Sequence, residues 1–223
     1  MAPSTIFLAG ASRGVGRELA NRLVRHSLAV TALVRSTTAA MELQAIGVTP
    51  VMGDALVESE VQSALATARF DAVISTIGGL PKDGQRADYR GNKHLIDAAV
   101  QAGVPRFILV SSIGSGNSAV ALPPQALQTL GAVLVEKAQA EQHLVASGLI
   151  YTVIRPGGLK SEPATGNGVL TSDPTVAGSI HRADVAELVC RCLLDDRAHH
   201  QILSAVDRNL VYGQPEFQEF LLN

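Results

Sequence analysis

The sequence has no tryptophan, few other aromatic residues and only two cysteines. Phe and Tyr together make up 4% of its 223 residues, so no evident set of rings could stack on a flat ligand. Cys190 and Cys192 lie two positions apart in a segment of helical period, where their side chains point to different faces, which argues against a disulfide or a shared metal. His199 and His200 stand in a polar turn, and adjacent side chains diverge. We therefore assign no metal site.

Strong charge of one sign and long apolar runs are also missing. The net charge is −2, and no cluster of Lys and Arg could track a phosphate backbone, which argues against nucleic-acid binding. No apolar run approaches the roughly 18 residues that span a bilayer. The first apolar stretch, residues 6–9, leads into a glycine loop and not into a signal-peptide cleavage site. We expect a cytoplasmic protein that binds neither nucleic acid nor membranes.

Short runs rich in Val and Ile alternate with longer stretches of helical period. Apolar residues recur four apart between the short runs, as at Val15, Leu19 and Leu23, and predict helices with one buried face. The alternation indicates βαβ units around a parallel sheet, and right-handed crossovers favour the strand order 3-2-1-4-5-6. The predicted fold class is α/β, a Rossmann-type doubly wound parallel sheet. Its strands are expected at residues 5–9, 29–34, 49–52, 72–76, 107–111 and 151–154.

The pattern changes in the last third of the chain. A long helix at 125–147, ended by Gly148, precedes the sixth strand, and the alternation weakens after Arg155. The remainder would form only a weak core of its own, so we predict one domain over residues 1–223, with 155–223 as a small C-terminal cap on the substrate side. Within this cap we expect a helix at 183–194 with Asp184 as its N-terminal cap, a strand near 202–206, and a tail with Phe217, Phe220 and Leu221 at helical spacing.

Three glycines lie between the first predicted strand and the first predicted helix, in the sequence Gly-Ala-Ser-Arg-Gly-Val-Gly. At this position a backbone without side chains can approach a pyrophosphate, and the amides of the helix N-terminus can hold it. Glycine also serves ordinary turns, but the strand–loop–helix context favours dinucleotide binding. The cofactor-binding residues expected from this loop are Gly10, Ser12, Arg13, Gly14, Val15 and Gly16.

The end of the second strand indicates which dinucleotide binds. NAD-binding sheets usually carry an acidic residue there, which accepts a hydrogen bond from the ribose 2′-hydroxyl. This sequence has Arg35 instead, and Arg13 of the glycine loop is expected on the same side, so two guanidinium groups could bind a 2′-phosphate. The alternative is that Arg35 is a solvated surface residue. We favour NADP (NADPH) over NAD as the cofactor.

Five motifs, taken in order, resemble those of the atypical short-chain dehydrogenase/reductase family, which includes NmrA-like proteins and the flavin reductase/biliverdin-IXβ reductases. They lie at residues 10–16, 53–55, 75–79, 110–114 and 155–159. The resemblance implies that Asp54 and Ala55 border the adenine. It also adds Thr76, Ile77, Gly78, Gly79, Pro156, Gly157, Gly158 and Leu159 to the expected cofactor-binding residues. The alternatives are a strand-end cap for Asp54 and an ordinary turn for Gly78 and Gly79.

Many reductases of this family use Tyr-x-x-x-Lys, in which the lysine lowers the pKa of the tyrosine that donates a proton. Here Lys137 matches but Val133 replaces the tyrosine. Lys137 could still hold a hydroxyl of the nicotinamide ribose; the alternative is a solvated salt pair with Glu141, four residues later. Without the phenol, simple reduction of an isolated carbonyl is disfavoured.

Two serines at the end of the fifth strand could act in its place. Ser111 and Ser112 are expected to face the nicotinamide, and Ser112 matches a serine near the substrate in the resembling reductases. A hydroxyl donor suffices when the hydride acceptor is conjugated, because the developing charge is delocalised. The alternative is that both serines bond local backbone. We expect an NADPH-dependent oxidoreductase acting on a flavin, bilin or quinone, with a catalytically silent NADP-binding sensor or assembly factor as the rival.

Overall fold

A computed structural model describes residues 3–78, 85–213 and 216–223, and an eight-stranded sheet forms its centre. The six predicted strands are parallel neighbours in the order 3-2-1-4-5-6, which confirms the fold class. The sheet then continues with β10, parallel to β6, and β8, antiparallel to β10. The bounds are β1 Thr5–Ala9, β2 Ala29–Val34, β3 Thr49–Met52, β4 Ala72–Ser75, β5 Arg106–Val110, β6 Ile150–Pro156, β8 Gly168–Thr171 and β10 Gln201–Asp207.

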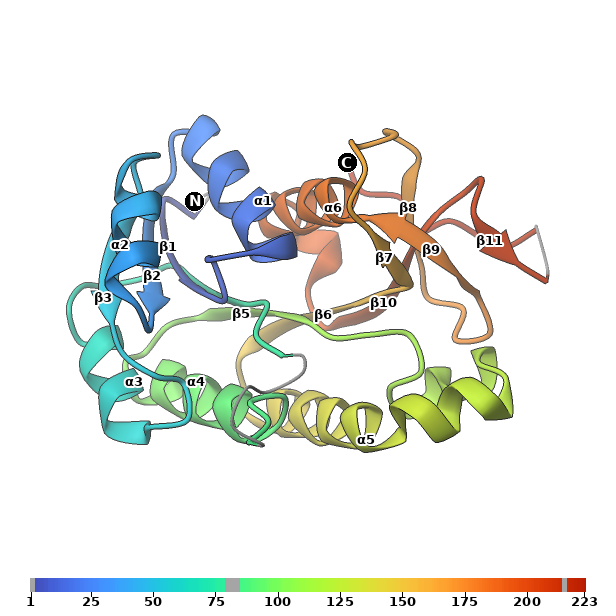
Figure 1. The fold of residues 1–223 in the computed structure, drawn as a ribbon, viewed down its shortest axis with the longest axis horizontal. Coiled ribbons are helices and arrows are strands. Elements are labelled where there is room, and N and C mark those ends of the chain that lie inside the picture. The colour runs from blue at the N-terminus through green and yellow to red at the C-terminus, as the bar shows by residue number, and fades with distance from the viewer. Residues whose placement is uncertain (1–2, 79–84, 214–215) are drawn as a thin grey trace.

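Helices cover both faces of this sheet (Figure 1). Successive residues of a strand point to opposite faces, and β1 shows this directly: Ile6 and Leu8 pack with one set of helices, Phe7 and Ala9 with the other. The first face carries α1 (Gly14–Arg25), α2 (Thr37–Gln44) and α6 (Arg182–Leu194). The second carries α3 (Glu58–Leu65), α4 (Arg90–Gln101) and α5 (Pro124–Ala146). Burial on both faces explains why the strand sequences are apolar runs and not alternating patterns.

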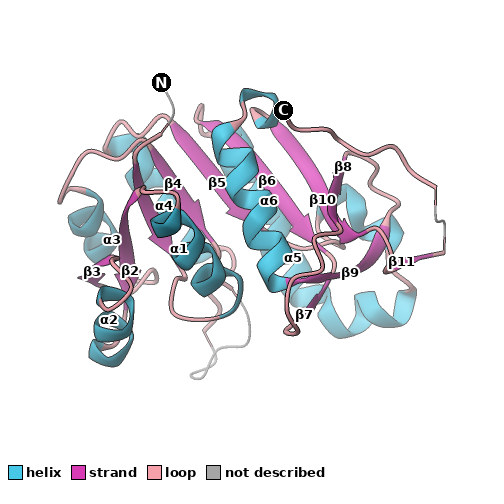
Figure 2. Ribbon diagram, turned by 90° about the horizontal axis from the view of Figure 1, so that it is seen from above, coloured by secondary structure: helices cyan, strands magenta, loops and turns pink. Residues whose placement is uncertain are grey.

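Part of the segment predicted as a cap, residues 155–223, forms a second, three-stranded sheet in the order β11-β9-β7, whereas β8 and β10 of the same segment extend the large sheet. The three-stranded sheet consists of β7 (Gly158–Lys160), β9 (Ala177–His181) and β11 (Val211–Tyr212), and we call it the cap sheet. The cap sheet lies at one end of the large sheet, beside β6, β8 and β10 (Figure 2). Its own small core joins Ile113, Val176 and Val206. The described residues also contain two short 3₁₀ helices, Gly116–Ala121 and Asp196–Ala198.

Most element boundaries fall within a residue or two of the predictions, and one element was wrong. Gly148 follows the end of α5 with φ +82, a left-handed conformation that ends the helix. The described tail, residues 216–223, contains no helix. Phe217 packs on the cap core and Phe220 on the α1–α6 side of the large sheet. Because its apolar side chains enter two different clusters, the tail is extended and runs beside β8, where the Phe220 amide donates to Leu170 O.

None of the described helices is both long and apolar enough to cross a bilayer.

Candidate functional site

A cleft runs along the carboxyl ends of the parallel strands, where open α/β sheets bind their ligands. Its volume is about 1460 Å³, larger than the roughly 300–1,000 Å³ of an ordinary small-molecule pocket, so it has room for a dinucleotide and a second molecule. All described residues of the predicted site line it, and Gly79 lies outside the described residues. They are Gly10, Ser12, Arg13, Gly14, Val15, Gly16, Arg35, Asp54, Ala55, Thr76, Ile77, Gly78, Ser111, Ser112, Lys137, Pro156, Gly157, Gly158 and Leu159.

The glycine loop has the shape that a pyrophosphate needs. A Cβ on Gly16 would lie 2.1 Å from the carbonyl oxygen of Gly10, so only glycine lets the start of α1 approach the end of β1. Helix α1 begins at Gly14; the residue before it, Arg13, makes no side-chain capping bond, and the first turn has no acidic residue. The amides of this turn are therefore not capped by a side chain and lie in a positive helix-dipole field. These residues fit a nicotinamide dinucleotide.

The adenosine end of the cleft combines two arginines with one carboxylate. The Arg35 side chain is 70% exposed, and its guanidinium lies 3.8 Å from the carboxylate of Asp54. Arg13 is exposed in the glycine loop. The end of β2 carries no acid, as the sequence indicated, but the segment after β3 places one beside Arg35. Asp54 Oδ1 also accepts a hydrogen bond from the Leu56 amide, so the carboxylate serves the local turn as well.

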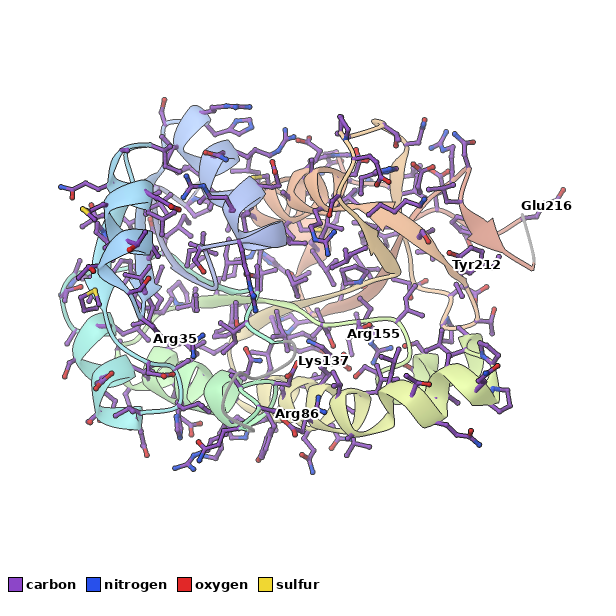
Figure 3. The ribbon with its side chains drawn as sticks, viewed as in Figure 1. Arg35, Arg86, Lys137, Arg155, Tyr212 and Glu216 are labelled. Carbon is purple, nitrogen blue, oxygen red and sulfur yellow. The ribbon has the colours of Figure 1, made fainter. Side chains whose placement is uncertain are left out.

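Lys137 is held by a buried carboxylate that sequence reasoning missed. Its Nζ lies 3.0 Å from Oδ1 of Asp88, whose side chain is fully buried. The predicted alternative, a salt pair between Lys137 and Glu141, is wrong, because Glu141 pairs with Arg155 instead. Lys137 rises from α5 toward the sheet (Figure 3), and Gly78 packs against it: a Cβ there would lie 3.0 Å from Nζ. The amine is thus fixed at the end of β4, beside the expected ribose position.

Below the two serines, a buried ion pair joins α5 to β6. Arg155 donates from Nε and Nη2 to the two carboxylate oxygens of Glu141, at 3.1 and 2.6 Å, and from Nη1 to Asn117. Ser111 Oγ donates to the same carboxylate. A hydroxyl has only one hydrogen, so Ser111 has none left to donate to a substrate in this conformation. Figure 3 shows Arg155 between the sheet and α5.

Ser112 is placed differently. Its Oγ donates to the adjacent carbonyl of Ile113 at 2.9 Å, and the residue is only partly buried. This hydrogen bond to local backbone is the alternative given above to a catalytic role for the two serines. It is also easily exchanged, because a partly exposed hydroxyl can rotate toward another acceptor. Of the two serines, Ser112 has the hydroxyl that is free to turn into the cleft.

The cap side of the cleft is bounded mainly by residues outside the five motifs, together with Ile113 from the motif at residues 110–114. Arg182 begins α6 and lines the cleft together with Tyr212, whose Oη is hydrogen-bonded to Ser179 Oγ. The wall also includes the apolar Ile113, Leu122 and Leu130, beside the polar Ser161 and Glu162. These residues come from segments far apart in the chain, which is why no sequence pattern showed them together.

Asp184 does not cap α6, contrary to the prediction. The N-cap position is His181, without a side-chain capping bond, and the Asp184 carboxylate accepts from the amides of Thr165 and Gly166. Thr165 Oγ1 lies between the carboxylates of Asp184 and Asp207. His181, Asp184 and Asp207 form a buried group whose ligand-type atoms all lie within 4.8 Å of one another. This group ties the loop around Thr165, which carries part of the cleft wall, to α6 and β10.

Comparison with known proteins identifies the family. The model of a family described as NAD(P)H-binding matches residues 10–196, and the chain therefore belongs to that family. An uncharacterised sugar epimerase of Bacillus subtilis, YhfK, is 34% identical over 193 residues, which cover 84% of this chain and 87% of that protein. Sanguinarine reductase of Eschscholzia californica is 36% identical over 116 residues, 49% of this chain and 41% of that enzyme. The chain spans less than half the length of several curated relatives that it matches.

Solved structures also indicate an NAD(P)H-binding fold. ChuY, an anaerobilin reductase from Escherichia coli O157:H7, superposes with a TM-score of 0.84 at 33% identity, covering 91% of this chain and 97% of that one. The resemblance to NmrA-like and other atypical short-chain dehydrogenases is thereby confirmed. The protein has the NAD(P)H-binding fold of a reductase, with a nicotinamide dinucleotide as its cofactor.

Proposed function

We propose that the protein is an NADPH-dependent reductase that transfers hydride to a conjugated acceptor of the bilin or flavin type. The observation that carries this proposal is the composition of the cleft around Lys137. The lysine is held in place by Asp88, the position of the missing tyrosine is Val133, and the wall beyond includes the apolar side chains of Ile113, Leu122 and Leu130. Such a site can bind a flat acceptor, whose own conjugation delocalises the developing negative charge, but it lacks the phenol that an isolated carbonyl requires.

When bound, the reduced nicotinamide supplies the hydride. Lys137, held by Asp88 at the end of β4, would bind a hydroxyl of the adjoining ribose. Ser112 would rotate from Ile113 O and donate a hydrogen bond to the heteroatom of the acceptor on which negative charge develops. Water in the open cleft would then supply the proton. ChuY, a reductase of a bilin by its description, supports this class of acceptor.

The preference for NADPH is tested by calorimetry. We expect NADPH to bind more tightly than NADH by about 1.5 to 3 kcal/mol, the usual scale of charge-assisted hydrogen bonds. Asp54 beside Arg35 weakens this preference without reversing it, because Arg13 adds a second cation. Arg35→Asp should remove most of the difference, whereas Arg25→Asp, at an exposed residue near the far end of α1, should leave it unchanged. Equal affinities of the wild type for NADPH and NADH would refute the preference.

Catalysis is tested by oxidation of NADPH with biliverdin, flavin mononucleotide and quinones as acceptors. On the best acceptor, Ser112→Ala should lower turnover by about one to two orders of magnitude, the range for loss of one neutral donor in a preorganised site. Its affinity for NADPH should stay within twofold of the wild type. Ser63→Ala, at an exposed serine of α3, is the matched control. Full turnover by Ser112→Ala would show that the serine only bonds local backbone.

The same screen tests the rival function. A catalytically silent NADP-binding sensor or assembly factor is favoured by two observations: Val133 replaces the phenol, and both serine hydroxyls are engaged within the protein. Such a protein would bind NADPH tightly and turn over none of the acceptors. Acceptor-dependent oxidation of NADPH would exclude it.

A further inference from the structure

Arg182 bridges the two walls of the cleft. As the first residue of α6, it extends over the start of α1, and its Nε lies 3.6 Å from the position that a Cβ on Gly14 would occupy. On the cap side, its Nη1 donates to Ser161 Oγ at 2.6 Å and reaches Leu159 O at 3.4 Å. Because α1 and α6 pack side by side (Figure 1), this guanidinium is carried on a rigid pair of helices.

The charge on Arg182 is not neutralised by the protein. Its hydrogen-bond acceptors are a hydroxyl and a carbonyl, and in the described part of the chain no carboxylate pairs with it. Of the other cations that line the cleft, Lys137 pairs with Asp88, Arg35 with Asp54 and Arg17 with Glu42, while Arg13, like Arg182, has no ion pair among the described residues. A guanidinium bound only to neutral groups retains its full capacity for an anion.

A dinucleotide pyrophosphate supplies the anion that this position fits. It carries two negative charges, and the N-terminus of α1 compensates only about half a charge. We propose that Arg182 is the cap-side ligand of the cofactor pyrophosphate, held toward it by Ser161, so that the glycine loop binds one side of the phosphates and α6 the other.

This inference rests on binding of a nicotinamide dinucleotide, which the family establishes, and not on the NADPH preference or the acceptor. NAD⁺ and NADP⁺ share the pyrophosphate and differ in the 2′-phosphate. Loss of Arg182 must therefore weaken both cofactors by the same factor, whereas loss of Arg35 weakens only NADP⁺. Since Ser161 belongs to the cap-side wall, cofactor binding would also order that wall before an acceptor enters.

The experiment is calorimetric titration of NAD⁺ and NADP⁺ into the wild type, Arg182→Gln, Arg182→Lys and Arg25→Gln. We expect Arg182→Gln to raise both dissociation constants by about ten- to hundredfold, the effect of one charge-assisted hydrogen-bond donor. Arg182→Lys should recover part of the loss, and Arg25→Gln should change neither constant. The dependence of log Kd on log salt concentration should become shallower in Arg182→Gln, because one cation no longer meets the phosphates.

Two results would overturn the proposal. Dissociation constants of Arg182→Gln within twofold of the wild type would show that Arg182 does not contact the cofactor; a raised KM for an acidic acceptor alongside them would assign it to the acceptor instead. An effect on NADP⁺ alone would place it at the 2′-phosphate. Thermal unfolding checks the fold of each variant. If Arg182→Gln is unfolded, Ser161→Ala replaces it, with a smaller rise in both constants expected and no rise counting against the proposal.

Discussion

Replacing Glu141 by glutamine should destabilise the protein strongly, although the change is nearly isosteric. The Glu141 and Arg155 side chains are 4% and 6% exposed, so water cannot solvate the charge that remains. In Glu141→Gln the buried guanidinium loses its counter-charge and one of two bidentate hydrogen bonds, because an amide presents one acceptor oxygen. Breaking a buried pair in this way costs about 3–5 kcal/mol.

That cost is a large part of the total stability of a domain, which is typically about 5–15 kcal/mol. For a chain of this size it corresponds to a fall in Tm of roughly 6–20 °C. Urea unfolding followed by circular dichroism measures the change. Glu187→Gln is the matched control, because Glu187 pairs with Arg22 at the surface, with side chains 41% and 31% exposed, and such pairs contribute about 0–1 kcal/mol.

A double variant separates the ion pair from its surroundings. Glu141→Met with Arg155→Met removes both charges, and hydrophobic replacement of a buried pair is often neutral or stabilising. The double variant should therefore be more stable than Arg155→Met alone, which leaves Glu141 buried with only Ser111 as a donor. If Glu141→Gln costs no more than Glu187→Gln, the pair is not desolvated in solution and the reasoning fails.

Two further predictions concern groups outside the cleft. The backbone amides of Ser4 and Thr5 donate to Asp71 and lower its pKa from 3.8 to about 2. Because folding lowers this pKa, the stabilisation is present above pH 3.8 and is lost as the pH falls toward 2. Asp71→Asn should therefore flatten the acid-unfolding curve between those two pH values, and an unchanged curve would contradict this. Burial raises the pKa of the Cys190 and Cys192 thiols to about 12. Both thiols should therefore resist a thiol-specific reagent at pH 8 and react once urea unfolds the chain. Rapid reaction of the native protein would contradict this and show that α6 opens.

The sequence predicted those features that neighbouring residues encode. Each strand of the 3-2-1-4-5-6 order is a local apolar run, and the glycine loop is a local motif, so their positions could be read without knowing what packs against them. The predictions differ from the structure where a side chain pairs with a residue that is distant in the sequence. Asp184 is predicted to cap its own helix but accepts from Thr165 and Gly166, and the alternative for Lys137, a pair with Glu141 along α5, is replaced by its contact with Asp88 before α4.

The same distinction separates the two halves of the cleft. The cofactor half is built from backbone and from residues at strand ends, whose positions follow from the parallel sheet. The acceptor half is built from the cap sheet and α6, and its wall is held by buried polar contacts such as Thr165 with Asp184 and Asp207. The pairing of the strands fixes where the strand ends of a parallel sheet lie, whereas loops on a rigid scaffold can vary in sequence and conformation. Acceptor specificity should therefore reside in the cap, and exchanging residues 162–166 for those of a relative, with Gly158, Leu159 and Ser161 left in place, should change the acceptor while leaving cofactor affinity intact.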